Sequence, residues 1–145
     1  GILELADRPG EVNLAISLHA ADDETRSRLV PLNRKYPLAK LREAVAAYIE
    51  RTGRRVTFEV VLLKQENDQL NDALNLVSFC EGLLCHVNLL RFNAFPGSPF
   101  RPADEAAEKE FRKVLKKAGV PVTVRRSRGS TILAACGQLS GKQEK

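Results

Sequence analysis

The sequence has no methionine and no tryptophan, and it contains only two histidines and three cysteines in 145 residues. An intact translated chain normally begins with methionine, whereas this one begins with Gly1, so we expect it to be part of a longer protein. It also has no apolar run of about 18 residues, the length needed to span a membrane, and no basic-then-apolar leader. We therefore expect a cytoplasmic protein with no membrane partner.

The three cysteines do not have the number or the spacing of a disulfide framework, which fits a reducing compartment. Cys80 and Cys85 are separated by four residues rather than the two that are typical of zinc knuckles. The sequence also lacks a P-loop and paired metal-binding carboxylates. These absences count against a phosphoester or sugar-phosphate enzyme on a small α/β sheet.

What remains is the composition of a folded, basic domain. Hydrophobic residues make up 43% of the chain, enough for one domain with a core, and the formal net charge is +5. The charge is concentrated at the carboxyl end, where nine Lys or Arg residues and only one acid, Glu144, follow residue 110. This distribution favours a polyanion partner, nucleic acid first; a solvated basic helix face is the alternative.

Four segments rich in β-branched and apolar residues alternate with helical patterns. The expected strands are residues 12–19, 55–63, 86–93 and 121–127. Apolar stripes at helical spacing occupy residues 38–49, 70–77 and 111–118, the first after Pro37 and the last before Gly119. Because a parallel strand must return through a crossover helix, the pattern predicts an α/β fold with parallel strands. Four strands suffice for half of a barrel or for a small open sheet.

Polar residues follow the expected strands, at the edge where ligands collect in parallel α/β folds. Ser17 and His19 end the first strand, Asn93 ends the third, and Arg125, Arg126 and Arg128 end the fourth. The arginines are candidates for contacts with RNA phosphates. The alternatives are that His19 is only a local hydrogen-bonding residue and that Asn93 only caps the Pro-Gly turn after it.

Two further side chains stand out by their surroundings. Glu59 lies in the middle of an apolar strand, where a carboxylate is costly unless it is paired or faces an interior site. Cys136 lies among small residues and close in sequence to the arginines, which would favour its thiolate form. A buried structural cysteine is the alternative interpretation of Cys136.

Four stretches, taken in order, resemble one family. They are "LAISLHAADDETRSRLVPLNRKYPL", "GRRVTFEVVLL", "NLLRFNAFPGSPF" and "VTVRRSRG" with the later "AACGQL". Together they are similar to the carboxyl-terminal part of the radical S-adenosylmethionine (SAM) enzymes that methylate adenine C2 in 23S ribosomal RNA and transfer RNA. A sister group that methylates adenine C8 of ribosomal RNA shares the architecture and is the nearest alternative.

The resemblance implies a fold, a cofactor and a set of site residues. Residues 1–139 would form the second half of a partial (β/α)6 barrel of the TIM-like radical SAM type, including a methyl-carrier segment, and residues 140–145 a polar tail. Ser17, Leu18, His19 and Asn93 match positions that contact SAM. Cys136 matches a cysteine that one SAM methylates, while a second SAM is cleaved to a radical that activates this methyl group for addition to adenine.

The sequence also departs from the family pattern. The C-x3-C-x2-C motif that holds the family's [4Fe-4S] cluster is absent, as are the glycine-rich SAM segment and the second catalytic cysteine. Leu133 stands in place of an acid, and Arg91 and Ala94 in place of prolines. We therefore expect the chain alone to be inactive, with the cluster ligands and the contact to an electron donor outside it. The hypothesis from another class is a non-catalytic α/β module that binds RNA.

Overall fold

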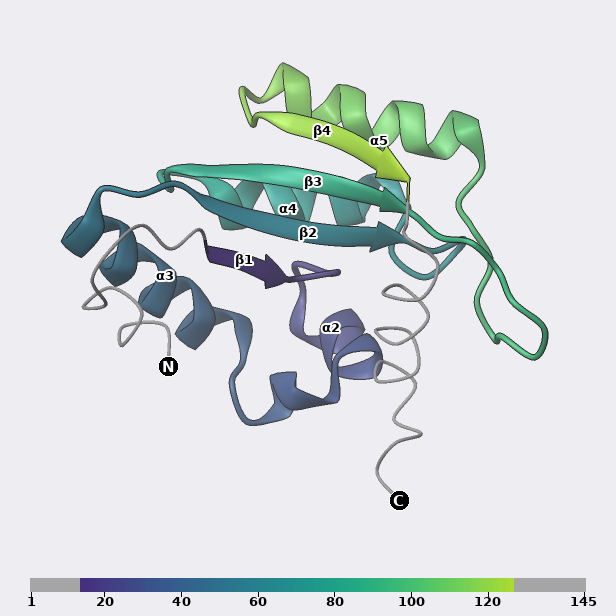
Figure 1. Cartoon of the computed structure of the whole chain (residues 1–145), viewed down its shortest axis with the longest axis horizontal. Coiled ribbons are helices and arrows are strands. Elements are labelled where there is room, and N and C mark those ends of the chain that lie inside the picture. Colours follow the sequence, from purple (N-terminus) through teal and green to yellow (C-terminus); the bar gives the residue numbers. More distant parts are fainter. Residues whose placement is uncertain (1–13, 127–145) are drawn as a thin grey trace.

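The computed structural model describes residues 14–126, which form a four-stranded parallel sheet backed by helices. The strands are β1 (Leu14–Ser17), β2 (Val56–Leu62), β3 (Cys85–Arg91) and β4 (Val122–Arg126). They lie side by side in the order of the sequence, and each is parallel to its neighbour (Figure 1). The α/β fold class is therefore confirmed, and each of the four expected strands is present, although the first ends at Ser17 rather than at residue 19.

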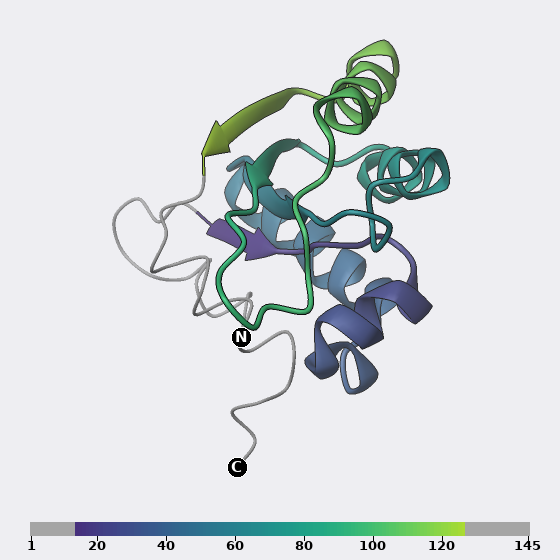
Figure 2. The ribbon, with the colours of Figure 1, turned by 90° about the vertical axis from the view of Figure 1, so that its right-hand side faces the viewer.

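A helical connection joins each strand to the next. The long helices are α3 (Leu38–Thr52), α4 (Leu70–Cys80) and α5 (Glu105–Lys117), and each contains one of the predicted apolar stripes. These three helices lie on the same side of the sheet (Figure 2). The connection from β1 to β2 also holds α2 (Asp23–Leu29) and the short 3-10 helix η1 (Pro31–Arg34). None of the helices between residues 14 and 126 is long and apolar enough to span a membrane.

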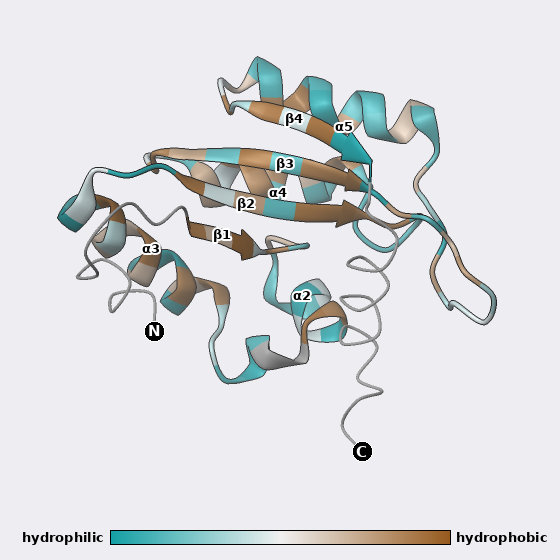
Figure 3. Ribbon diagram, in the orientation of Figure 1, coloured by the Kyte–Doolittle hydropathy of each residue, from teal (hydrophilic) through white to brown (hydrophobic). Residues whose placement is uncertain are grey.

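The face of the sheet that meets the long helices holds the main core. On β2, the side chains on this face are Val56, Phe58, Val60 and Leu62, and all four are buried. They pack with apolar residues of α3, α4 and α5. Phe58 meets Phe79 of α4 edge to face, with ring centroids 5.3 Å apart. Figure 3 shows the resulting concentration of apolar residues along β1 to β3.

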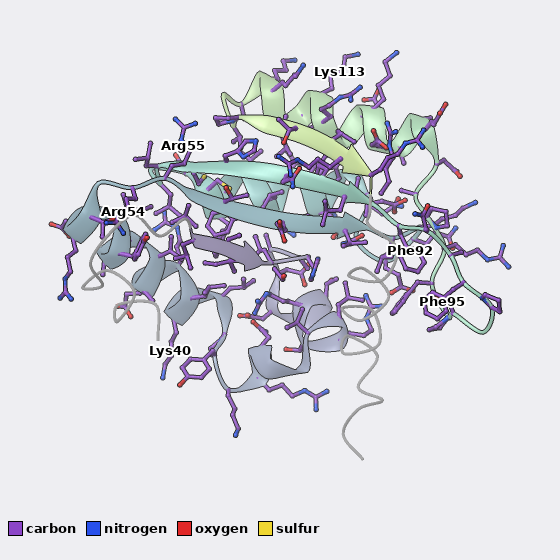
Figure 4. All side chains as sticks on the ribbon, viewed as in Figure 1. Lys40, Arg54, Arg55, Phe92, Phe95 and Lys113 are labelled. Carbon is purple, nitrogen blue, oxygen red and sulfur yellow. The ribbon has the colours of Figure 1, made fainter. Side chains whose placement is uncertain are left out.

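A smaller apolar cluster lies at the carboxyl end of the sheet. It consists of Leu29, Val61, Leu63 and Phe92. Phe95, in the loop after β3, packs against this cluster with its ring 6.2 Å from that of Phe92 (Figure 4). Residues 60–63 are all buried, so the end of β2 is covered on both faces, as its continuous apolar sequence predicts.

The helix that sequence patterns did not predict is α2. Its sequence, Asp-Glu-Thr-Arg-Ser-Arg-Leu, has no apolar stripe. Its first turn is instead stabilised by a cap, because the carboxylate of Asp22 accepts a hydrogen bond from the Thr25 N–H at 2.7 Å. Gly119, by contrast, lies where expected, just after α5, with a φ of 83° that glycine adopts without strain.

Candidate functional site

The carboxyl ends of the four parallel strands meet at one edge of the sheet, and the expected site residues lie along this edge. Ser17 ends β1, and Asn93 follows the end of β3, with β2 between the two strands. The side chain of Ser17 is exposed, whereas Leu18 and His19 are buried. The edge therefore brings the Ser17–His19 segment and Asn93 to the same end of the sheet, on strands that are not direct neighbours.

The backbone of the Ser17–His19 segment is fixed to β2 and held in an unusual conformation. The N–H groups of Leu18 and His19 both donate to the carbonyl oxygen of Glu59, at 2.9 and 3.2 Å. His19 has a φ of 62°, in the left-handed region that few residues other than glycine adopt. Such a conformation persists only where the surrounding contacts hold it in place.

Arg26 of α2 supplies one set of these contacts. Its guanidinium donates to the carbonyl oxygens of Leu18 at 2.9 Å and Ser17 at 3.4 Å. A third hydrogen bond, at 2.9 Å, goes to the side-chain oxygen of Asn33. Burial lowers the pKa of Arg26, and the charge of Asp23 acts in the opposite direction. Arg26 thus places a buried cation directly behind the segment.

Asn67, in the loop after β2, supplies the second set of contacts that hold the Ser17–His19 segment. Its amide nitrogen donates to the carbonyl oxygens of His19 at 2.6 Å and Val61 at 2.8 Å, and its amide oxygen accepts from the Leu63 N–H at 2.8 Å. Asn67 is only 1% exposed, so these bonds are made without competition from solvent. This side chain therefore links the end of β2 to the left-handed residue after β1.

The ring of His19 is a structural hydrogen-bond acceptor. Its Nδ1 accepts from the Val61 N–H at 3.1 Å, so the proton of the neutral ring is on Nε2. Burial, with a smaller effect from the charge of Arg26, lowers the pKa of His19 to about 4. His19 is therefore neutral at physiological pH and already engaged at the nitrogen that would accept a proton.

Asn93 lies beside a pocket of about 270 Å³ between the carboxyl end of the sheet and α5. Arg91 and Glu108 also line this pocket and form a two-pronged ion pair, with N···O distances of 2.7 and 2.9 Å. The hydrogen bonds from Arg91 hold the pKa of Glu108 below its ordinary value. Arg91 is thus anchored to α5.

Arg125 and Arg126 lie on opposite faces of β4, because successive side chains of a strand alternate. Arg126 lines the pocket that Asn93 borders. On the other face, burial and the charges of Arg55 and Arg125 lower the pKa of His86. Both arginines are exposed, and they point to opposite faces of the strand. Arg128 and Cys136 lie outside the described residues, as does the expected tail at 140–145.

Cys80 and Cys85 lie at the opposite edge of the sheet, at the end of α4 and the beginning of β3. Both are buried free thiols, and the hydrogen bond between them raises the pKa of Cys80 and lowers that of Cys85. Between residues 14 and 126 no three His, Cys, Asp or Glu side chains form a group that could hold a metal ion. The described thiols therefore do not fit a [4Fe-4S] cluster, whose iron needs several thiolates close together.

Sequence reasoning from motifs found Ser17, His19 and Asn93 but did not identify Arg26, Asn33 or Asn67. Their hydrogen-bond partners are between 4 and 48 residues away in the sequence, and the bonds of Arg26 and of Asn67 to the Ser17–His19 segment cross from one loop or helix to another, so no repeated spacing reveals them. The available signal was the presence of several polar residues in the two segments that follow β1 and β2. These residues form the buried polar support of the site.

No protein-family model matches this chain. It is 48% identical over 144 residues to a Geobacillus kaustophilus protein named probable dual-specificity RNA methyltransferase RlmN, covering 99% of this chain and 40% of that protein. A Thermus thermophilus protein of the same name is 47% identical, covering 98% of this chain and 40% of its own length. The chain thus spans about 40% of the length of these relatives.

Solved structures give a consistent result. The crystal structure of a radical SAM methyltransferase from Sphaerobacter thermophilus has a TM-score of 0.87 and 49% identity, covering 94% of this chain and 40% of that one. A domain of pyruvate-formate lyase-activating enzyme from Bacteroides vulgatus has a TM-score of 0.66 at 15% identity, which is a likeness of fold alone. These similarities confirm the resemblance drawn from the four sequence stretches.

Proposed function

We propose that this chain is part of a radical SAM enzyme that methylates C2 of adenine in 23S rRNA and tRNA. The chain is homologous to the dual-specificity RNA methyltransferases over nearly all of its own length. The observation that carries the proposal is 48% identity across 99% of the chain, a span that includes both the strand ends and the "AACGQL" segment. The structural similarity to a radical SAM methyltransferase supports the same reaction class.

In this proposal Ser17, Leu18, His19 and Asn93 contribute to the SAM site at the carboxyl edge of the sheet. Bound SAM supplies the methyl group and the radical chemistry of the reaction. Ser17 offers an exposed hydroxyl, whereas the N–H and C=O groups of Leu18 are already hydrogen-bonded within the protein. His19 is neutral and holds the backbone of the segment in place, so we assign it a positioning role and no proton transfer.

We assign the role of methyl carrier to Cys136. A thiolate is a far better nucleophile than an aromatic ring carbon, so covalent transfer through sulfur divides one difficult methylation into feasible steps. Arg125, Arg126 and Arg128 are assigned to RNA phosphates, which provide most of the affinity of RNA binding. The positions of Arg125 and Arg126 on two faces of β4 support contacts with separate parts of the RNA.

The [4Fe-4S] cluster of such an enzyme has no fitting ligands among the described residues. We therefore place its three cysteines, and the surface that meets the electron donor, outside this chain. The reducing conditions that a cluster and free thiols require favour the cytoplasm as the location.

The proposal is tested by the RNA of cells that lack their own enzyme of this type and express the full-length protein that contains this chain. We expect mass spectrometry of digested 23S rRNA and tRNA to find 2-methyladenosine. Cys136→Ala should abolish the product, whereas Cys80→Ala, which changes a thiol at the far edge of the sheet, should retain it. Finding only 8-methyladenosine would assign the protein to the sister group, and finding neither product would reject the proposal.

A further inference from the structure

The face of the sheet opposite the long helices carries a row of polar side chains. The strand register places Ser17 beside Glu59, Glu59 beside Asn88 and Asn88 beside Thr123. The side chains of these residues lie on the face of the sheet that points away from the main core. In Figure 2 the helices α3, α4 and α5 all lie on the other side. The row therefore crosses all four strands at one level of the sheet.

Hydrogen bonds within the row fix which groups it presents. The Thr123 hydroxyl donates to the side-chain oxygen of Asn88 at 3.1 Å and is 3.0 Å from Nε2 of His86. Since the one hydroxyl proton goes to Asn88, Nε2 of His86 is the donor in the second bond. Asn88 is only 5% exposed and its amide oxygen is engaged, so its N–H groups are the part of this side chain that can still donate to another molecule.

Glu59 presents only acceptors. Its carboxylate is half-buried, and among residues 14–126 it has no hydrogen-bond or ion-pair partner. A half-buried carboxylate loses part of its hydration, so it is retained most readily where something else donates hydrogen bonds to it. Its backbone carbonyl, meanwhile, holds the N–H groups of Leu18 and His19. The strands are about 4.8 Å apart, so a molecule touching Ser17 is within reach of Glu59.

The chemistry of the row selects among ligands. An anion such as phosphate would be repelled by the Glu59 carboxylate, and a bare ammonium would gain nothing from the donor groups of Asn88. A hydroxyl both donates and accepts, so it suits a carboxylate beside an amide N–H. Two neighbouring hydroxyls can donate to the two oxygens of one carboxylate, a geometry used by acidic residues that bind the ribose of nucleotides.

We infer that Glu59, supported by Asn88 and Ser17, binds the ribose hydroxyls of the adenosyl group of SAM. The inference rests on the proposed function and deepens it, by assigning a new contact residue to the SAM site. A nucleotide within an RNA strand has its 3′ oxygen in a phosphodiester and offers only the 2′-hydroxyl. The free pair of hydroxyls in SAM therefore fits the carboxylate better than the RNA does.

The test uses the full-length protein and measures SAM binding by calorimetry. Hydrogen bonds to a charged group are worth about 1.5–3 kcal/mol, so Glu59→Gln should weaken SAM binding by roughly ten- to hundredfold. The matched control is Glu50→Gln, which removes a carboxylate from an exposed position on α3 and should leave the affinity unchanged. A SAM analogue without the 2′-hydroxyl should bind wild-type protein more weakly and should lose little further affinity in Glu59→Gln.

The outcomes separate this inference from the proposed function. A wild-type protein that binds no SAM overturns both. A wild-type protein that binds SAM, with unchanged affinity in Glu59→Gln, overturns the assignment of Glu59 alone. Weaker RNA binding with unchanged SAM binding in Glu59→Gln would mean that the carboxylate takes an RNA 2′-hydroxyl, which also overturns it. If Glu59→Gln does not fold, the test is the comparison of SAM with its 2′-deoxy analogue in wild-type protein. Equal affinity for the two molecules refutes a ribose contact.

Discussion

Asn67 is the side chain whose removal should most clearly disrupt the site at the carboxyl edge. It is 1% exposed and makes three hydrogen bonds of 2.6–2.8 Å, to the His19 and Val61 carbonyls and from the Leu63 N–H. Asn67→Ala leaves the Leu63 N–H and the His19 carbonyl buried without these partners. Each buried polar group left unsatisfied costs about 1–3 kcal/mol, so we expect the free energy of unfolding to fall by about 2–6 kcal/mol.

A second substitution separates hydrogen bonding from side-chain shape. Asn67→Asp keeps the size of the side chain and the acceptor for Leu63, but it points a carboxylate oxygen at two carbonyl oxygens. It should therefore destabilise the protein at neutral pH and recover part of this loss in acid, where the carboxyl group is protonated and can donate again.

The assay is urea-induced unfolding of the full-length protein, compared through the transition midpoint and its slope. Asn71→Ala is the control, since Asn71 is exposed near the start of α4 and should change stability by no more than about 0.5 kcal/mol. The reasoning is refuted if Asn67→Ala is as stable as Asn71→Ala, because the buried hydrogen bonds would then contribute nothing measurable.

Three further predictions follow from the charged groups. The pKa of His19 is about 4 in the folded protein, against an ordinary value of 6.5. As the pH falls from 6.5 towards 4, His19 becomes protonated in the unfolded chain but not in the folded one, so the free energy of unfolding should fall by up to about 1.4 kcal/mol per pH unit. Measured by unfolding at a series of pH values, His19→Gln should lose this slope. Arg91 lowers the pKa of Glu108, so the ion pair should stabilise the protein above pH 4.5 and lose this effect as the pH falls through the lowered pKa. The free energies of unfolding of wild type and Glu108→Gln should therefore converge in acid, and a difference that stays constant with pH would contradict this. Arg125→Ala should reduce the slope of log RNA affinity against log salt concentration by about 0.7–0.9, and Arg126→Ala should reduce it by less, because acidic side chains line the same pocket as Arg126. Equal slopes for both variants and wild type would show that neither arginine contacts RNA.

The strands and long helices were predictable because their signals are local. Residues 55–63 alternate or run apolar at the spacing of a buried strand, and β2 occupies Val56–Leu62. The helix α2 was missed because its stability comes from the Asp22 cap and from contacts of Arg26 and Leu29 with distant residues, none of which leaves a periodic pattern.

The place of the candidate residues in the fold was predictable from the sequence, and their chemical state was less so. The resemblance indicated Ser17 and His19, and the structure places them at the end of β1. The neutral state of His19 arises from burial and from Arg26, which only the folded chain brings behind it. The separation of Arg125 from Arg126 follows from strand alternation alone, so the sequence contained that information.

The central claim is that this chain carries the methyl-carrier sulfur of an RNA methyltransferase. The most direct measurement follows a labelled methyl group from SAM in the full-length protein, by mass spectrometry of both the digested protein and the digested RNA. The account predicts the label on the peptide containing Cys136 and on C2 of adenine, with both lost in Cys136→Ala. Wild-type amounts of labelled adenine in Cys136→Ala would contradict it.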